Sequence, residues 1–127
     1  LIKGLNQQAV LASGAINILY VNSDGSCPAP CYTHPQLAVD AAADGDVVKI
    51  AGTGIYTQTY LRNGHEQIIY ISKTLSLIAG YDGNFTEPPN YMMPINLQPI
   101  TNTRAVYIDN NTSVTLQYFN FIVLFYL

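Results

Sequence analysis

The stretch A-V-D-A-A-A-D-G-D-V-V-K-I-A-G-T-G-I-Y, from Ala38 to Tyr56, contains the change of period that decides the fold. Its first half is rich in alanine and follows helical spacing. Asp44-Gly45 then ends the helix, because glycine readily adopts the conformation that closes a last helical turn. The run Val47–Ala51 is short and rich in β-branched residues, which is typical of a strand. The stretch therefore predicts a helix that leads through a tight turn into a buried strand.

The helix is predicted over residues 34–43. Thr33 is a suitable N-cap, and Gln36 stands three residues later, as in a capping box. Pro35 fits the first turn, where its missing N–H costs nothing. The inner face is apolar and mostly small, formed by Leu37, Ala38, Ala41 and Ala42. Such a face predicts close packing against the end of a sheet.

Short β-branched segments separated by polar bends predict the strands. They are Tyr20–Val21, Val47–Ala51, Gln67–Ser72, Leu75–Ala79, Arg104–Asp109 and Ser113–Tyr118. Asn63-Gly64 is the one dipeptide of the type that closes tight hairpins, and we expect it in a longer loop.

Two segments of the chain resemble each other, and both read as strand, polar bend, strand. They are Y-I-S-K-T-L-S-L, from Tyr70 to Leu77, and Y-I-D-N-N-T-S-V-T-L, from Tyr107 to Leu116. The coils of a β-solenoid turn in this way, so we predict coils at 47–67, 68–104 and 105–127, with an insertion at 81–94. Stacked repeats need about three units to be stable, so this chain sits at the minimum. Residues 1–20 are interpreted as an N-terminal segment and residues 21–127 as the solenoid domain.

These residues also carry a family resemblance. Ala38–Tyr56 resembles the start of right-handed parallel β-helix proteins of the pectate-lyase-like superfamily, where a capping helix leads through a Gly-Asp turn into the first coil. The stretch I-S-K-T-L-S-L-I-A-G-Y-D-G-N-F-T-E-P, from Ile71 to Pro88, is similar to the second coil of a bacterial subset. The resemblance covers about residues 20–120. It implies an all-β fold, a short right-handed parallel β-helix of about three coils with an N-terminal capping helix.

The composition excludes several functional classes. Charged residues make up 10% of the 127 residues and hydrophobic residues 49%, and the net charge is -3. Five Lys and Arg residues are too few for a nucleic-acid interface. No segment reaches the ~20 apolar residues that span a bilayer. A neutral polar surface instead favours a secreted structural or binding protein.

Cys27 and Cys31, in C-P-A-P-C, are predicted to form a small-loop disulfide. Free thiols and a metal site that includes His34 are the alternatives. A disulfide would agree with an oxidising, extracellular location.

No cluster of titratable residues indicates catalysis, so we predict no catalytic residue, no metal and no cofactor. Asp44 and Asp46 are better explained by the turn between helix and strand. His34 and His65 are interpreted as surface residues. Carbohydrate remains a candidate partner, and the predicted sugar-stacking residues are Tyr56, Tyr60, Tyr81 and Tyr91. Glycosylation sequons stand at Asn84, Asn110 and Asn111.

The apolar ends of the chain predict self-assembly. An unpaired strand edge is a template for further pairing, and an exposed apolar terminus favours a second subunit. The predicted interface consists of Phe119, Phe121, Ile122, Val123, Leu124, Phe125, Tyr126, Leu127, Leu1, Ile2 and Leu5. The hypothesis is a secreted, non-catalytic subunit that assembles head-to-tail into a filament or surface layer. The alternative is the N-terminal part of a carbohydrate-binding or polysaccharide-cleaving β-helix protein.

Overall fold

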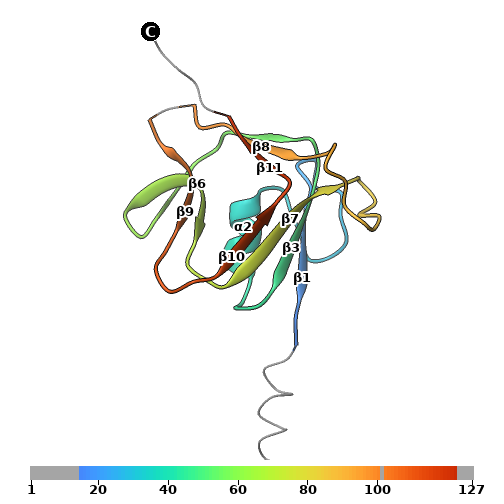
Figure 1. Cartoon of the computed structure of the whole chain (residues 1–127), viewed down its shortest axis with the longest axis horizontal. Helices are drawn as coiled ribbons and strands as arrows, with labels where there is room; N and C mark the ends of the chain where they lie inside the picture. Colours follow the sequence, from blue (N-terminus) through green and yellow to red (C-terminus); the bar gives the residue numbers. More distant parts are fainter. Residues whose placement is uncertain (1–14, 101, 123–127) are drawn as a thin grey trace, which may run out of the picture.

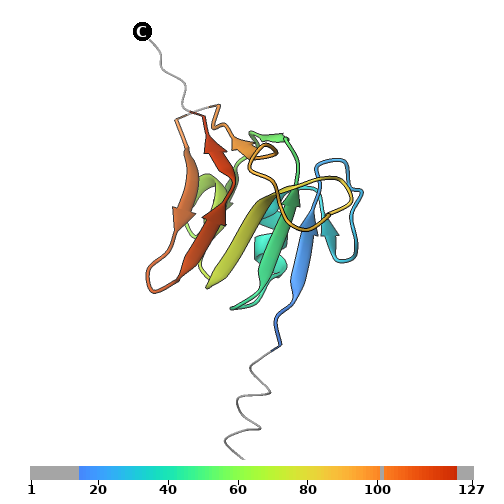
Figure 2. The ribbon, with the colours of Figure 1, turned by 45° about the vertical axis from the view of Figure 1, so that its right-hand side comes forward.

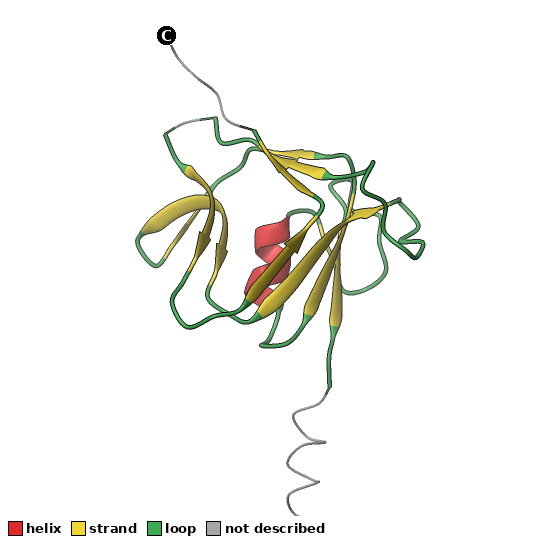
Figure 3. Ribbon diagram, viewed as in Figure 1, coloured by secondary structure: helices red, strands yellow, loops and turns green. Residues whose placement is uncertain are grey.

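The computed structural model describes residues 15–100 and 102–122, which form three small sheets around one helix (Figure 1). In the view of Figure 3, helix α2 (Pro35–Ala41) is seen behind the strands. Sheet A is entirely parallel, in the order β10 (Val114–Gln117), β7 (Leu75–Tyr81), β3 (Val47–Ala51), β1 (Ile18–Val21) and β2 (Cys31–Tyr32).

The other two sheets have three strands each. Sheet B is parallel, in the order β11 (Phe119–Phe121), β8 (Ile95–Leu97) and β4 (Ile55–Tyr56). In sheet C, β6 (His65–Ile71) lies between β5 (Tyr60–Arg62) and β9 (Arg104–Ile108). It pairs with β5 antiparallel and with β9 parallel.

The predicted fold class, an all-β right-handed parallel β-helix of about three coils, is wrong. The strands form several separate small sheets of mixed direction, and a helix is part of the fold. The antiparallel pair arises at Asn63-Gly64, which does not lie in a longer loop but joins β5 directly to β6. Asn63 has φ 52° and Gly64 has φ 80°, and two positive φ angles produce a tight hairpin turn that suits twisted strands.

The helix lies within the predicted range, but its caps differ from the prediction. His34 is the N-cap, and its Nδ1 accepts the N–H of Gln36 at 3.0 Å. The side chain of Gln36 takes no part in a capping box, because it is used in a tertiary contact. Its Oε1 accepts the N–H of Tyr70 at 2.6 Å, and its Nε2 donates to the carbonyl of Tyr70 at 3.1 Å. A buried side-chain amide thus docks α2 onto the backbone of β6.

The carboxyl end of α2 is also held by a tertiary contact. Lys73 lies in the bend between β6 and β7, and its Nζ donates to the carbonyls of Val39, Asp40 and Ala42. A cation at this end satisfies carbonyls without helical partners and complements the helix dipole. These contacts fix the helix at one end of the core.

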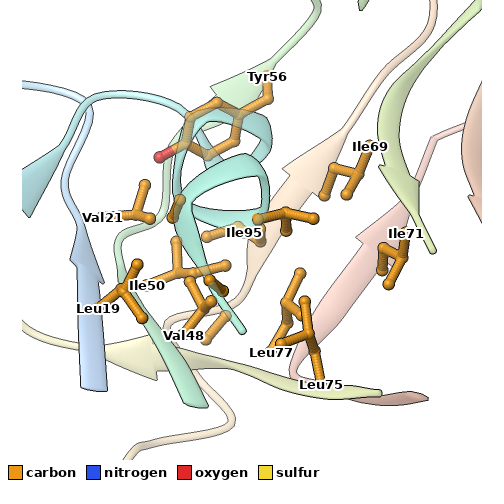
Figure 4. Close-up of a cluster of buried hydrophobic side chains, with 14 of the residues drawn as sticks. Leu19, Val21, Val48, Ile50, Tyr56, Ile69, Ile71, Leu75, Leu77 and Ile95 are labelled. Atoms are coloured by element: carbon orange, nitrogen blue, oxygen red, sulfur yellow. The ribbon is translucent and has the colours of Figure 1, made fainter. Parts of the chain in front are cut away.

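The core fills the space between the sheets and α2 (Figure 4). In sheet A, residues in register stack across the strands, for example Leu19, Val48 and Leu77. The exposed fraction of these side chains is 4%, 0% and 0%. A smaller cluster of Ala51, Tyr81 and Phe85 involves the loop that follows β7. Apolar burial of this kind supplies most of the folding free energy.

Candidate functional site

The last strand of each sheet lies at the same end of the molecule. These strands are β9 in sheet C, β10 in sheet A and β11 in sheet B, and we call them together the end layer. Figure 2 shows them side by side, opposite to β1. Two corners with positive φ, at Asn111 and Tyr118, turn the chain from β9 into β10 and from β10 into β11. A continuous stretch of chain therefore builds the whole layer.

Apolar side chains of the end layer extend the core, but they are more exposed than the core residues in register with them. Ile108 is in register with Ile71, and their exposed fractions are 45% and 0%. Phe121 is in register with Leu97, and the corresponding fractions are 51% and 0%. Val106, Val114, Leu116 and Phe119 are partly buried against the same core. No described segment covers this layer.

The backbone of the end layer is paired on one side only. Asp109 N–H donates to Ile71 at 2.8 Å, and Ile122 N–H donates to Leu97 at 2.9 Å. Successive residues of a strand point their backbone groups in alternate directions. The N–H and C=O groups of Phe119 and Phe121 therefore point away from β8, toward the free edge.

On its outer face, sheet B carries an amide ladder. Asn120 is in register with Asn96, and its Nδ2 donates to Asn96 Oδ1 at 3.2 Å. Asn96 in turn donates to the carbonyl of Gly54 at 3.4 Å. Each amide thus donates toward β4, which leaves Asn120 Oδ1 as an acceptor at the end layer. Ladders of this type continue when another strand is added.

Sheet C carries an aromatic stack instead. Tyr70 and Tyr107 are in register, with ring centroids 5.5 Å apart, and His65 stacks on Tyr107 at 4.2 Å. The Tyr70 hydroxyl donates to Asp109 at 2.8 Å, which lowers the pKa of that carboxyl below its usual value. The guanidinium of Arg104 lies over Tyr107 at 5.4 Å. Among the three edges, β9 is therefore the one that carries a cation.

Helix α2 covers the opposite end of the core, and its cap residue is buried. His34 is 6% exposed, and its ring packs edge-on against Tyr56 at 5.3 Å and Tyr60 at 4.8 Å. The interpretation of His34 as a surface residue is thus wrong, because its imidazole replaces Thr33 as the helix cap. Burial lowers the pKa of His34 to about 4, against a smaller effect of the Gln58 backbone.

We expect mild acid to destabilise the fold through His34. The neutral ring is required in the folded chain, whereas the unfolded chain protonates near pH 6.5. The unfolded state therefore binds more protons between about pH 6.5 and 4, and stability falls as the pH falls through this window. Between pH 7 and 5 the loss is about 2 kcal/mol. Urea unfolding at both pH values measures this loss.

His34→Asn, which keeps a capping side chain that does not titrate, should lose most of this pH dependence of stability, while His65→Asn should retain it. Equal pH dependence in wild type and His34→Asn would contradict the assignment.

The predicted sugar-stacking residues do not form a platform. Tyr56 and Tyr81 are only 4% and 2% exposed, because they point inward or lie under a loop. Tyr60 is partly buried, with Arg62 over its ring at 5.1 Å. Tyr91 is 75% exposed. These tyrosines therefore do not present a shared face to a sugar.

The carboxylates are engaged in structural contacts. Asp40 pairs with Arg62 at 2.6 Å, and Glu87 pairs with Lys49. Asp46 accepts the N–H groups of Asn17 and Ala43 in the turn after α2, as expected from its position. Within residues 15–100 and 102–122, no group of three or more His, Cys, Asp or Glu side chains is placed to hold a metal ion.

The predicted disulfide is confirmed, since Cys27 and Cys31 are bonded with their Cα atoms 5.4 Å apart. The sequon residues Asn84, Asn110 and Asn111 are all exposed.

Three residues of the predicted interface, Phe119, Phe121 and Ile122, lie in or directly after β11. The others, Leu1, Ile2, Leu5 and Val123 to Leu127, lie outside the described residues. Prediction missed the contributions of β9 and β10 and of Asn120. The internal similarity contained the signal, because it aligns Tyr107 with Tyr70 and Leu116 with Leu77, the same pairs that lie side by side in the sheets.

No protein-family model matches the chain, and neither the curated proteins nor the solved structures yielded a match. The resemblance to pectate-lyase-like proteins therefore stays a prediction. Among the described residues, no helix has the length and apolar character needed to cross a membrane.

Proposed function

We infer that the chain is a non-catalytic structural subunit that assembles with copies of itself through the end layer. The observation that carries this proposal is the higher exposure of apolar side chains in β9 and β11 than of their partners in register in β6 and β8. Ile71 and Leu97 are fully buried, whereas Ile108 and Phe121, in register with them, are about half exposed. Uncovered apolar side chains beside unpaired strand edges favour association with further β-structure.

A second copy is the partner that the composition favours. The chain has few charges, so two copies repel each other weakly, and β11 itself contains no charged residue. A cytosolic or membrane-bound partner has no comparable support among the described residues. The predicted head-to-tail filament and a closed dimer are both assemblies of this kind. In the filament the end layer of one copy contacts a different surface of the next copy, whereas in the dimer it contacts the end layer of the second copy.

An extracellular location is part of the proposal. The Cys27–Cys31 disulfide supports it weakly, because disulfides persist mainly in oxidising compartments. A carbohydrate-binding function receives less support, because two of its four predicted tyrosines are buried.

Replacing an apolar residue of the end layer by a charge tests the proposal. In sedimentation velocity at micromolar concentrations, we expect the wild type to sediment as particles larger than the 13.9 kDa chain. Phe121→Lys should raise the dissociation constant at least ten-fold, because burying an unpaired ammonium is costly. Ile100→Lys is the matched control, since Ile100 is 55% exposed but lies outside the end layer.

Circular dichroism establishes that both variants fold. If wild type and Phe121→Lys remain single chains at every concentration, the proposed function is wrong. Equal weakening by Ile100→Lys would place the contact elsewhere on the surface.

A further inference from the structure

We propose that two copies meet end layer to end layer, with β11 of each pairing antiparallel across a two-fold axis at Asn120. This inference rests on the proposed function and specifies the partner surface. It makes the basic assembly a closed dimer, because both copies use the same patch and the contact closes on itself.

The register of the contact follows from the directions of the backbone groups. Phe119 and Phe121 point their N–H and C=O groups to the free edge, whereas those of Asn120 point toward β8. In an antiparallel pair, residues that face the partner stand opposite each other and exchange two hydrogen bonds. Phe119 therefore pairs with Phe121 of the second copy, and Phe121 with its Phe119. Asn120 then stands opposite Asn120 of the second copy.

The sequence F-N-F reads the same in both directions, so this register places like side chains together. Phe119 and Phe121 lie on the core side, in register with Ile95 and Leu97, and their rings stack at 6.4 Å. Across the axis four phenylalanine rings would cover the uncovered ends of both cores. Cross-strand aromatic pairs at such positions are favourable.

On the outer face, the amide ladders of the two copies would meet at Asn120. Asn120 Nδ2 donates to Asn96, so the Oδ1 of Asn120 is the ladder atom left on the side of the second copy. Two asparagines opposite each other at a non-hydrogen-bonded position have their Cα atoms about 4.5 Å apart. A bridging water can then donate to both Oδ1 atoms.

The other surfaces fit this role less well. The N-terminal end of the core is covered by α2, which Gln36 and Lys73 hold in place. Strand β9 carries Arg104 over its aromatic stack. Strand β10 has the same alternation as β11, in V-T-L, but both of its apolar residues, Val114 and Leu116, are partly buried. In β11 Phe119 is partly buried too, but Phe121 is 51% exposed. Pairing at β11 therefore covers the more exposed apolar side chain of these two strands, Phe121.

Single-cysteine variants test the axis. In Asn120→Cys, the Cα atoms of the two new cysteines would lie about 4.5 Å apart. This distance falls within the range of about 4.4–6.8 Å that a disulfide requires. Mild oxidation should therefore yield a covalent dimer on non-reducing gels. Thr115→Cys is the matched control, because Thr115 is also an exposed residue of the end layer, on strand β10. We expect the cross-linked fraction of Asn120→Cys to be at least ten-fold higher.

A mixture of Asn17→Cys and Asn120→Cys chains probes the head-to-tail arrangement, because Asn17 is exposed beside the start of β1. Sedimentation of the reduced variants separates two kinds of failure. If they assemble but cross-link through Thr115→Cys, through the Asn17→Cys mixture or through none of these positions, the two-fold contact is wrong and the proposed function stands. If they remain single chains, both proposals are wrong.

Discussion

Replacing Gln36 by alanine should destabilise the protein by about 2–6 kcal/mol, because two buried backbone groups of Tyr70 would lose their partners. Gln36 is fully buried, and its side-chain amide bonds both the N–H and the C=O of Tyr70, as the backbone of a neighbouring strand would. Each buried N–H or C=O left unpaired costs about 1–3 kcal/mol. A small domain has only about 5–15 kcal/mol of stability, so this single change would remove much of it.

Urea denaturation measures the effect, and Gln117→Ala provides the control. Gln117 is an exposed residue of β10, so the same truncation there should change the free energy of unfolding by less than about 0.5 kcal/mol. If both variants lose equally little stability, Gln36 does not dock α2 onto β6 in the way the hydrogen bonds indicate.

Gly80→Ala is expected to cost about 2–5 kcal/mol, from left-handed backbone strain and from overpacking. Gly80 lies in β7 with φ 88°, a conformation that side chains other than glycine rarely adopt. An added Cβ would stand 2.8 Å from the carbonyl oxygen of Asn90 and 2.8 Å from Cδ2 of Tyr118. The first contact is with backbone that also donates to Gly80 at 2.7 Å, so it cannot move away cheaply.

Gly83→Ala serves as the matched variant, because a Cβ on Gly83 meets nothing within 4 Å. Thermal unfolding should show a clear loss for Gly80→Ala and almost none for Gly83→Ala. Similar melting temperatures would show that the loop after β7 relaxes freely, which would contradict the close packing around Gly80.

Local patterns were informative where short-range physics decides the structure. The turn at Asp44-Gly45 and the change to a strand at Val47 were predictable, because alanine-rich spacing and β-branched residues act locally. The loss of the capping role predicted for Gln36 was not predictable, because a partner 34 residues away takes its amide instead. The hairpin at Asn63-Gly64 was predictable, because the preference of this dipeptide for positive φ is a strong hairpin signal, and the expected longer loop is wrong.

Burial was harder to predict for residues beside loops. In β4, Ile55 is 61% exposed and Tyr56 is 4% exposed. Both residues are largely apolar, so the sequence does not indicate which of the two faces the core. Tyr81 illustrates the same limit, since the loop after β7 contributes Phe85 to the cluster that buries it. The end layer, by contrast, could be anticipated from the repeat of Tyr70 in Tyr107, because segments that resemble each other came to lie in parallel register.

Hydrogen exchange of the backbone amides in β11 measures directly whether the edge of this strand is covered by a second copy. Phe119 and Phe121 are the residues whose N–H groups face the free edge, so only association at this edge can protect them. We expect their exchange to slow at least ten-fold as the concentration rises from the micromolar to the millimolar range, while the exchange of Ile100 stays constant. Exchange of Phe119 and Phe121 that is fast and independent of concentration would contradict it.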